Sequence, residues 1–354
     1  MPSLFIKTTL LLSFMQLSVQ LHAQTADELY KSGIQKINQK EYTEAIAIFT
    51  NILIKDKFYP EAHLNRGVAK AYNHDYKSAI ADFDEAILLE PKNPKAYFNR
   101  GLSQFDVNNY KEALLDFSKA IEYNDTDGDT FKYRGTVKAI LQDLPGAIND
   151  FTTAIDLNPF DMDAFFNRGM ARSEDADFKG AIADFSTVIA TQSMDAESYN
   201  NRGVARYNRQ DYNGAIADHN KATKLNPNEW LYYQNRAITK YAIKNYLAAI
   251  ADYSKAIELN AHCAEAYYGR AIARFAIKDY KGAVADHSLA IANKPNYSEA
   301  YYNRALCLSA MKKHAEALKD YTKATEIQPE HPNAYYVTEV TKFRISHKAG
   351  YNKK

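Results

Sequence analysis

The stretch PKAYFNRGLSQFDVNNYKEALLDFSKAIEYNDTD, residues 94–127, decides the fold of this chain. Its pattern of 34 residues recurs without insertion from residue 26 to residue 331. The eighth position of every copy is glycine or alanine, at Gly33, Gly67, Gly101, Gly135, Gly169, Gly203, Ala237, Ala271 and Ala305. A fixed period of this size indicates stacked copies of one small unit that cannot bury its apolar face alone.

Each copy is predicted to form two antiparallel helices. In residues 94–127 one stripe at helical spacing ends at Asn108, and a second stripe begins at Ala113. The second helix of several copies closes with proline, which cannot continue a helix. We expect Gly101 and Ala113 to mark the closest approach of the two helices, with Phe117 filling a wider gap one turn further on.

The copies define the domain organisation. Residues 1–23 carry one lysine before an apolar run, which predicts a secretory signal peptide cleaved before Gln24, with an uncleaved N-terminal anchor as the alternative. Nine repeats follow, at residues 26–59, 60–93, 94–127, 128–161, 162–195, 196–229, 230–263, 264–297 and 298–331. Residues 332–354 are predicted to form a capping helix and a basic tail, because a terminal repeat needs a polar outer face.

This pattern resembles the tetratricopeptide repeat family, whose signature places an aromatic residue, glycine, alanine, a second aromatic residue, alanine and proline at these spacings. The resemblance implies an all-α fold: a right-handed superhelical α-solenoid of antiparallel helix pairs. It also implies that the first helix of each pair lines a concave groove, which usually binds a peptide or a protein segment.

Charge and motif content argue against other function classes. Lysine and arginine number 44 and aspartate and glutamate 43, whereas a general nucleic-acid binder usually carries a basic surplus. No metalloprotease, nucleophile-elbow, phosphate-loop or dinucleotide-binding motif occurs in the sequence. The repeats leave no room for a catalytic domain, so we expect no enzyme activity, no cofactor and no bound metal.

An arginine precedes the glycine or alanine in eight copies, and an aspartate follows it sixteen residues later. The pairs are Arg66 and Asp82, Arg100 and Asp116, Arg134 and Asp150, Arg168 and Asp184, Arg202 and Asp218, Arg236 and Asp252, Arg270 and Asp286, and Arg304 and Asp320. We expect a ladder of two-pronged ion pairs, flanked in six copies by a second basic residue that would lower the aspartate pKa. We interpret the ladder as structural rather than anion-binding, because each arginine has its own aspartate.

An asparagine stands before the arginine in six copies, at Asn65, Asn99, Asn167, Asn201, Asn235 and Asn303. Asparagine is a mediocre helix former, so its recurrence inside a helix needs an external reason. In the resembled family this position faces the groove, where an amide can both donate to and accept from the backbone of an extended peptide. The alternative is that the amides bond neighbouring helices or water. Tyr133 and Gly269 interrupt the column.

The position before the asparagine is aromatic at Phe98, Phe166, Tyr268 and Tyr302. These side chains would line the groove, unless they pack between repeats. The starts of the first helices are mostly acidic, at Asp27, Glu61, Asp129, Asp163, Glu197, Glu265 and Glu299. The acidic starts favour a neutral or basic partner.

The sequence therefore predicts an exported protein–protein interaction scaffold, periplasmic or associated with the cell envelope. It would bind an extended peptide or partner protein in its groove, with no nucleic-acid partner and no membrane span after signal cleavage. The alternative is a structural spacer or oligomerisation module that uses its convex face or its ends.

Overall fold

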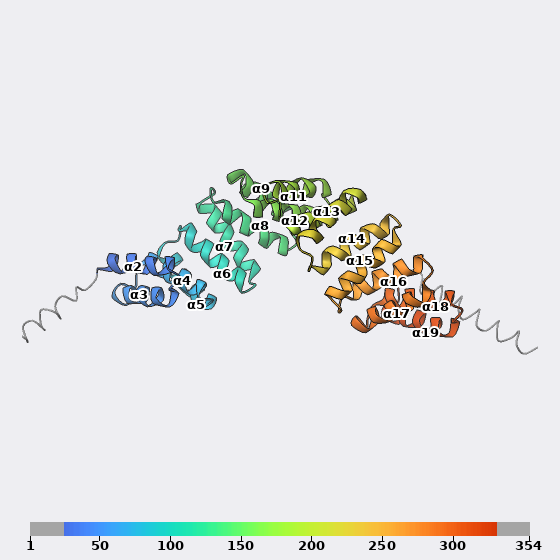
Figure 1. Ribbon diagram of the computed structural model, residues 1–354. Coiled ribbons are helices and arrows are strands. Elements are labelled where there is room, and N and C mark those ends of the chain that lie inside the picture. The colour runs from blue at the N-terminus through green and yellow to red at the C-terminus, as the bar shows by residue number, and fades with distance from the viewer. Residues whose placement is uncertain (1–24, 331–354) are drawn as a thin grey trace, which may run out of the picture. The chain divides into compact units, whose positions relative to one another are not determined.

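The computed structural model describes residues 25–330, and this part of the chain contains helices and turns but no strand. The predicted all-α fold is confirmed. Contacts divide the chain into two compact units, residues 1–164 and residues 165–354, whose helices are labelled in Figure 1. The predicted signal peptide at residues 1–23 and the predicted capping helix at residues 332–354 lie outside the described residues.

In the first unit, four helical hairpins follow one another. They are α2 (Ala26–Asn38) with α3 (Tyr42–Lys55), α4 (Pro60–Tyr72) with α5 (Tyr76–Leu89), α6 (Pro94–Asp106) with α7 (Tyr110–Tyr123), and α8 (Gly128–Ile140) with α9 (Leu144–Leu157). The two helices of a hairpin pack on each other, and the second helix also packs on the first helix of the next hairpin. The unit is therefore a solenoid, in which each hairpin contacts only its neighbours.

The second unit continues the pattern after α10 (Met162–Glu174), which begins two residues before the boundary. Its further helices are α11 (Phe178–Thr191), α12 (Ala196–Asn208), α13 (Tyr212–Leu225), α14 (Trp230–Ala242), α15 (Tyr246–Leu259), α16 (Ala264–Ala276), α17 (Tyr280–Asn293), α18 (Ser298–Ala310) and α19 (His314–Ile327). From α12 onward the hairpins pack as in the first unit.

The turn inside every hairpin has one residue in the left-handed backbone region, and none of these residues is glycine. Their φ angles are 61–66°, at Lys40, His74, Asn108, Gln142, Ala176, Gln210, Lys244, Lys278 and Lys312. In several hairpins the next residue caps the second helix, as when the Asp177 carboxylate accepts from the Gly180 N–H at 2.9 Å. Because side chains disfavour this conformation, the packing of the two helices must hold the turn in place.

The aromatic residue of the second helix lies directly against the glycine of the first. A Cβ on Gly33 would lie 2.6 Å from Cζ of Phe49, and one on Gly101 would lie 2.8 Å from Cε1 of Phe117. Our expectation for Phe117 was wrong, because its ring covers Gly101 instead of filling a gap one turn away. Glycine is needed at these positions since a methyl group would meet the ring.

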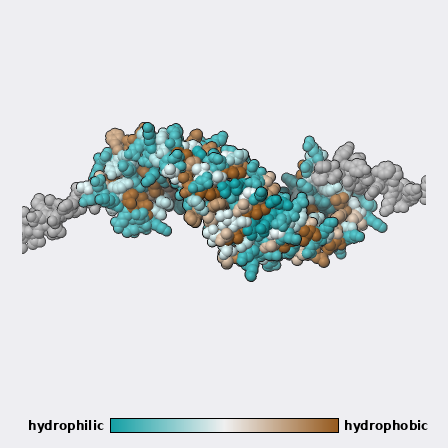
Figure 2. Space-filling view, turned by 90° about the horizontal axis from the view of Figure 1, so that it is seen from above, coloured by the Kyte–Doolittle hydropathy of each residue, from teal (hydrophilic) through white to brown (hydrophobic). Residues whose placement is uncertain are grey.

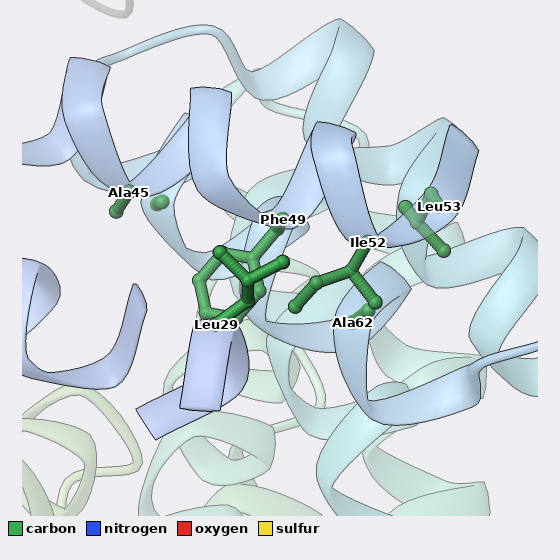
Figure 3. Close-up of a cluster of buried hydrophobic side chains, with 7 residues drawn as sticks. Leu29, Ala45, Phe49, Ile52, Leu53 and Ala62 are labelled. Carbon is green, nitrogen blue, oxygen red and sulfur yellow. The ribbon is translucent and has the colours of Figure 1, made fainter. Parts of the chain in front are cut away.

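Consecutive hairpins share one core. Leu29 of α2, Phe49 and Ile52 of α3, and Ala62 of α4 are buried in a single cluster (Figure 3). Helix α4 belongs to the next repeat, so an isolated hairpin of α2 and α3 would leave part of this cluster open to water.

Two histidines replace the aromatic residue of the second helix, His219 on α13 and His287 on α17. Both are fully buried, and neither ring nitrogen of either residue has a hydrogen-bond partner in the described part of the chain. Burial lowers the pKa of His219 from 6.5 to about 4, helped by the Arg236 cation and opposed by Asp252. Burial and the Arg304 cation lower the pKa of His287 to about 3. Both rings are therefore neutral in the folded protein near neutral pH.

We predict that these histidines make the second unit acid-sensitive. The unfolded chain takes up their protons below pH 6.5 and the folded chain does not, so stability present above pH 6.5 is lost as the pH falls towards 4. Each histidine contributes up to about 1.4 kcal/mol per pH unit in that window. The double variant His219→Phe/His287→Phe, with the ring found in most repeats, should flatten this slope in urea unfolding measured from pH 7 to pH 4. Equal slopes for variant and parent would contradict the prediction.

Candidate functional site

The first helices of successive hairpins form one wall of each unit. α4 contacts α2 and α6, and α14 contacts α12 and α16, whereas no two successive second helices make a comparable contact in the described residues. First helices therefore stand closer together than second helices do, and each unit curves with its first helices inside. We call the surface of α2, α4, α6 and α8, and that of α12, α14, α16 and α18, the first-helix wall.

The asparagine column is half-buried, and four of its members use their N–H groups inside the protein. Nδ2 of Asn65 donates to the backbone oxygen of Glu61 at 2.8 Å and to the Tyr30 hydroxyl of the preceding hairpin at 3.0 Å. Asn303 makes the same two kinds of bond, to its own helix and to the preceding first helix. The sequence left open the alternative that these amides bond neighbouring helices. Asn65 and Asn303 do so.

The bonds leave the amide oxygens available. Asn99 donates only to the backbone oxygen of Lys95, at 2.7 Å, and Asn235 donates to Oδ1 of Asn200 at 3.0 Å. Oδ1 has no hydrogen-bond partner among the described residues at Asn65, Asn99, Asn235 and Asn303. Oδ1 of Asn201 accepts from Asn200 at 3.4 Å, and Asn167 is half-buried on α10. The column thus offers spaced acceptors rather than the paired donors and acceptors we expected.

The predicted aromatic residues are partly core residues. Each packs its ring on the aromatic or histidine ring of its own second helix, with ring centroids 5.6–5.9 Å apart. The pairs are Phe98 with Phe117, Phe166 with Phe185, Tyr268 with His287, and Tyr302 with Tyr321. All four first-helix residues remain half-buried, so one part of each ring supports the hairpin and another part is accessible.

Each unit has a cavity on the first-helix wall. One of about 210 Å³ is lined by Val68 of α4 and by Asn99 and Leu102 of α6. The other, of about 330 Å³, is lined by Ile238 of α14 and Ile272 of α16. Both apolar pairs stand three residues after the asparagine position, so the same column provides an apolar lining in both units. On the face drawn in Figure 2, apolar residues gather in small separate groups among hydrophilic ones.

Each arginine of the predicted ladder forms a two-pronged pair with its aspartate. Nε and Nη2 of Arg202 donate to the two carboxylate oxygens of Asp218 at 2.9 and 2.7 Å. The same geometry joins Arg66 to Asp82, Arg100 to Asp116, Arg134 to Asp150, Arg168 to Asp184, Arg236 to Asp252, Arg270 to Asp286 and Arg304 to Asp320. All eight aspartates are buried, so the pairs lie inside the hairpins.

The arginines also bind the preceding hairpin, which the sequence analysis missed. Nη1 of Arg202 donates to Oγ of Ser186 at 3.0 Å. Five other arginines reach the residue sixteen positions before them in the same way: Thr50, Asp84, Asn220, Ser254 and Ser288. The sequence did contain a signal for this contact, because a polar residue recurs two positions after the ladder aspartate.

The second basic residue reaches the carboxylate in all six repeats that have it, at 2.6–2.8 Å, from Lys70, Lys138, Arg172, Arg206, Lys240 and Arg274. Asp116 lacks this cation, because Gln104 occupies the position. There burial raises the pKa of Asp116 and outweighs the effect of Arg100.

Family comparison agrees with this geometry. A tetratricopeptide repeat (TPR) model matches residues 94–127, 196–229 and 298–331, and a second TPR model matches residues 235–298. The chain is a tetratricopeptide repeat protein. TPR proteins are generally non-enzymatic scaffolds for protein–protein interaction, and this fold suggests protein or peptide partners.

Two solved structures, with TM-scores of 0.54 and 0.50, share the fold. The APC/C hetero-tetramer Cut9–Hcn1 matches with a TM-score of 0.54 and 13% identity, over 84% of this chain and 59% of that chain. The C-terminal part of a TPR protein from Cytophaga hutchinsonii matches with a TM-score of 0.50 and 19% identity, over 77% of this chain and 98% of that one. YrrB, described as a TPR protein with an unusual peptide-binding site, is 26% identical over 52% of this chain and 95% of its own, with a TM-score of 0.49. No curated protein matches the sequence.

The described part of this TPR protein is residues 25–330. Within that range no helix has the length and apolarity that a bilayer crossing requires. The same residues contain no group of three or more histidine, cysteine, aspartate or glutamate side chains placed to hold a metal ion.

We predict that removing a ladder arginine from this TPR protein costs stability more than binding. Arg202→Ala should cost about 2 kcal/mol of unfolding free energy, because Asp218 keeps its contact with Arg206 at 2.8 Å. Arg100→Ala should cost more, about 3–5 kcal/mol, since Asp116 then has no cation in its hairpin. Urea unfolding measures both, with the exposed Lys255→Ala as a control that should leave the midpoint unchanged. Parental midpoints for the two arginine variants, combined with lost partner binding, would overturn the structural role.

Proposed function

We propose that this TPR protein binds an extended segment of a partner protein along its first-helix wall, and that it does so outside the cytoplasm. The observation that carries the proposal is the row of unpartnered amide oxygens at Asn65, Asn99, Asn235 and Asn303. Each can accept one hydrogen bond from the backbone N–H of a bound segment, whatever that segment's side chains. One such bond contributes about 0.5–1.5 kcal/mol, so several are needed for useful affinity.

The cavities and the charges of the wall support the same proposal. Cavities of about 210 and 330 Å³, each lined partly by apolar side chains, suit side chains projecting from a segment held at its backbone. The acidic residues at the starts of the first helices, among them Glu61, Glu197 and Glu299, are exposed. An acidic rim favours a neutral or basic partner and disfavours nucleic acid, whose phosphates need a basic surface.

Removing one amide in each unit should weaken binding without unfolding the protein. We expect peptides selected from a phage-displayed library of random nine-residue sequences to bind Asn99→Ala/Asn235→Ala about fivefold more weakly than the parent. A peptide held on either unit loses one acceptor in this variant. Isothermal titration calorimetry gives the affinities, and Asn149→Ala, an exposed asparagine on second helix α9, is the matched control.

Unchanged affinity for the double variant, with peptides still bound, would place the working surface elsewhere. The spacer or oligomerisation module that uses the convex face or the ends would then be the better function.

The proposed location rests on the apolar segment at residues 1–23. We expect the chain recovered from the extracytoplasmic fraction of expressing bacteria to begin at Gln24, as read by intact mass. Leu12→Arg should interrupt the apolar run and keep the full-length chain in the cytoplasm. A full-length chain in the membrane fraction would instead support the uncleaved anchor.

A further inference from the structure

The cavity between α14 and α16 is rich in tyrosine. Four tyrosines line it: Tyr241, Tyr253, Tyr268 and Tyr297. Two isoleucines, a glutamine, a glutamate and Gly269 complete the lining, and no lysine, arginine or histidine takes part. Its volume is about 330 Å³, enough for the end of a long side chain.

Gly269 creates this cavity by interrupting the asparagine column. A Cβ on Gly269 would lie 2.4 Å from Cζ and 2.6 Å from the hydroxyl oxygen of Tyr253. In four other repeats the residue at the place of Tyr253 is a phenylalanine and an asparagine follows sixteen residues later, as with Phe83 and Asn99. Tyr253 and Gly269 therefore differ from this pair together, and the tyrosine hydroxyl takes the place of the asparagine amide.

Several polar groups of the cavity can accept hydrogen bonds from a bound side chain. The hydroxyls of Tyr241, Tyr253 and Tyr297 have no hydrogen-bond partner among the described residues, although Tyr253 is only 5% exposed. Glu265 adds a carboxylate at the opening, where its side chain is 53% exposed. Burial raises the pKa of Tyr253, so its hydroxyl stays neutral. Aromatic faces and a carboxylate together attract a cation.

The rim of the cavity already holds a cation of the protein itself. Nζ of Lys294 lies 4.5 Å from the ring centroid of Tyr297 and 3.3 Å from Oε1 of Glu265. Both side chains of this ion pair are about half exposed, so the lysine stands at the edge and can be displaced.

We propose that this cavity, the tyrosine pocket, binds the side chain of an arginine in the partner segment. A guanidinium is planar and stacks on tyrosine rings, and its five N–H groups match the unpartnered hydroxyls and the Glu265 carboxylate. An ammonium would use fewer of these acceptors. The proposal rests on the proposed function, since the arginine arrives on a segment held along the first-helix wall.

The test uses the full chain and peptides selected from the random nine-residue library. Peptides that bind the second unit should be enriched in arginine at one position. Replacing that arginine by citrulline, which keeps the shape and removes the charge, should weaken binding about tenfold, and lysine should be intermediate.

Variants of the protein locate the effect. Glu265→Gln should reduce the preference for arginine over citrulline, and Glu258→Gln, on the exposed side of second helix α15, is the matched control. Tyr253→Phe/Gly269→Asn installs the pairing of Phe83 and Asn99, so it should fold, keep binding to the wall and lose the arginine preference. Lys294→Gln should strengthen binding of the arginine peptide, because a competing cation is removed.

The outcomes separate the two proposals. Peptides that depend on the asparagines but bind equally well with arginine or citrulline would overturn the tyrosine pocket and leave the wall intact. Equal arginine preference in the parent and in Tyr253→Phe/Gly269→Asn would also overturn it. A library that yields no peptide sensitive to Asn99→Ala/Asn235→Ala would overturn the proposed function itself.

Discussion

An aromatic ring packed against a residue without a long side chain holds each hairpin together. The ring of Phe117 covers Gly101, and the first helix cannot shift without exposing both. This contact brings the rest of the hairpin into register: the buried aspartate next to the ring on the second helix meets the arginine next to the glycine on the first. The helix pair, the ion pair and the strained turn between the helices therefore depend on one steric fit.

The arginine extends this fit from one hairpin to the next. Arg202 binds Asp218 within its hairpin and Ser186 in the preceding one, so a single guanidinium ties three helices. A buried guanidinium needs all of its N–H groups satisfied, and the stack of repeats supplies the last acceptor. Because the ladder arginines are bonded within the protein, their charge is not available to a ligand. The recognition that we propose therefore uses the neutral and acidic residues of the first helices.

The same wall gives the two units different chemistry. In the first unit Asn99 and two apolar side chains line a small cavity. In the second, Gly269 replaces the asparagine and Tyr253 replaces a phenylalanine, which turns the equivalent place into a larger cavity rich in hydroxyls. A repeat scaffold can thus change specificity by a paired exchange that leaves its helix packing unaltered. Tyr133 shows another solution, because its ring stacks on Phe117 where an asparagine would otherwise stand.

The sequence by itself determined the helix pairs and the pairing of each arginine with its aspartate, because a period of 34 residues places the same side chains at the same height in every copy. It missed the left-handed turns at residues such as Ala176, since no glycine marks them. It missed the bond from Arg202 to Ser186 and the contact of Phe117 with Gly101, which depend on the distance between helices. Only the tertiary structure decided that the N–H groups of Asn65 donate to its own helix and to the preceding first helix. It also decided that Gly269 leaves space for the hydroxyl of Tyr253. The physical reason is that a periodic sequence pattern shows which residues recur. A hydrogen-bond acceptor is free, and a cavity is open, only where no side chain of a neighbouring helix occupies that place.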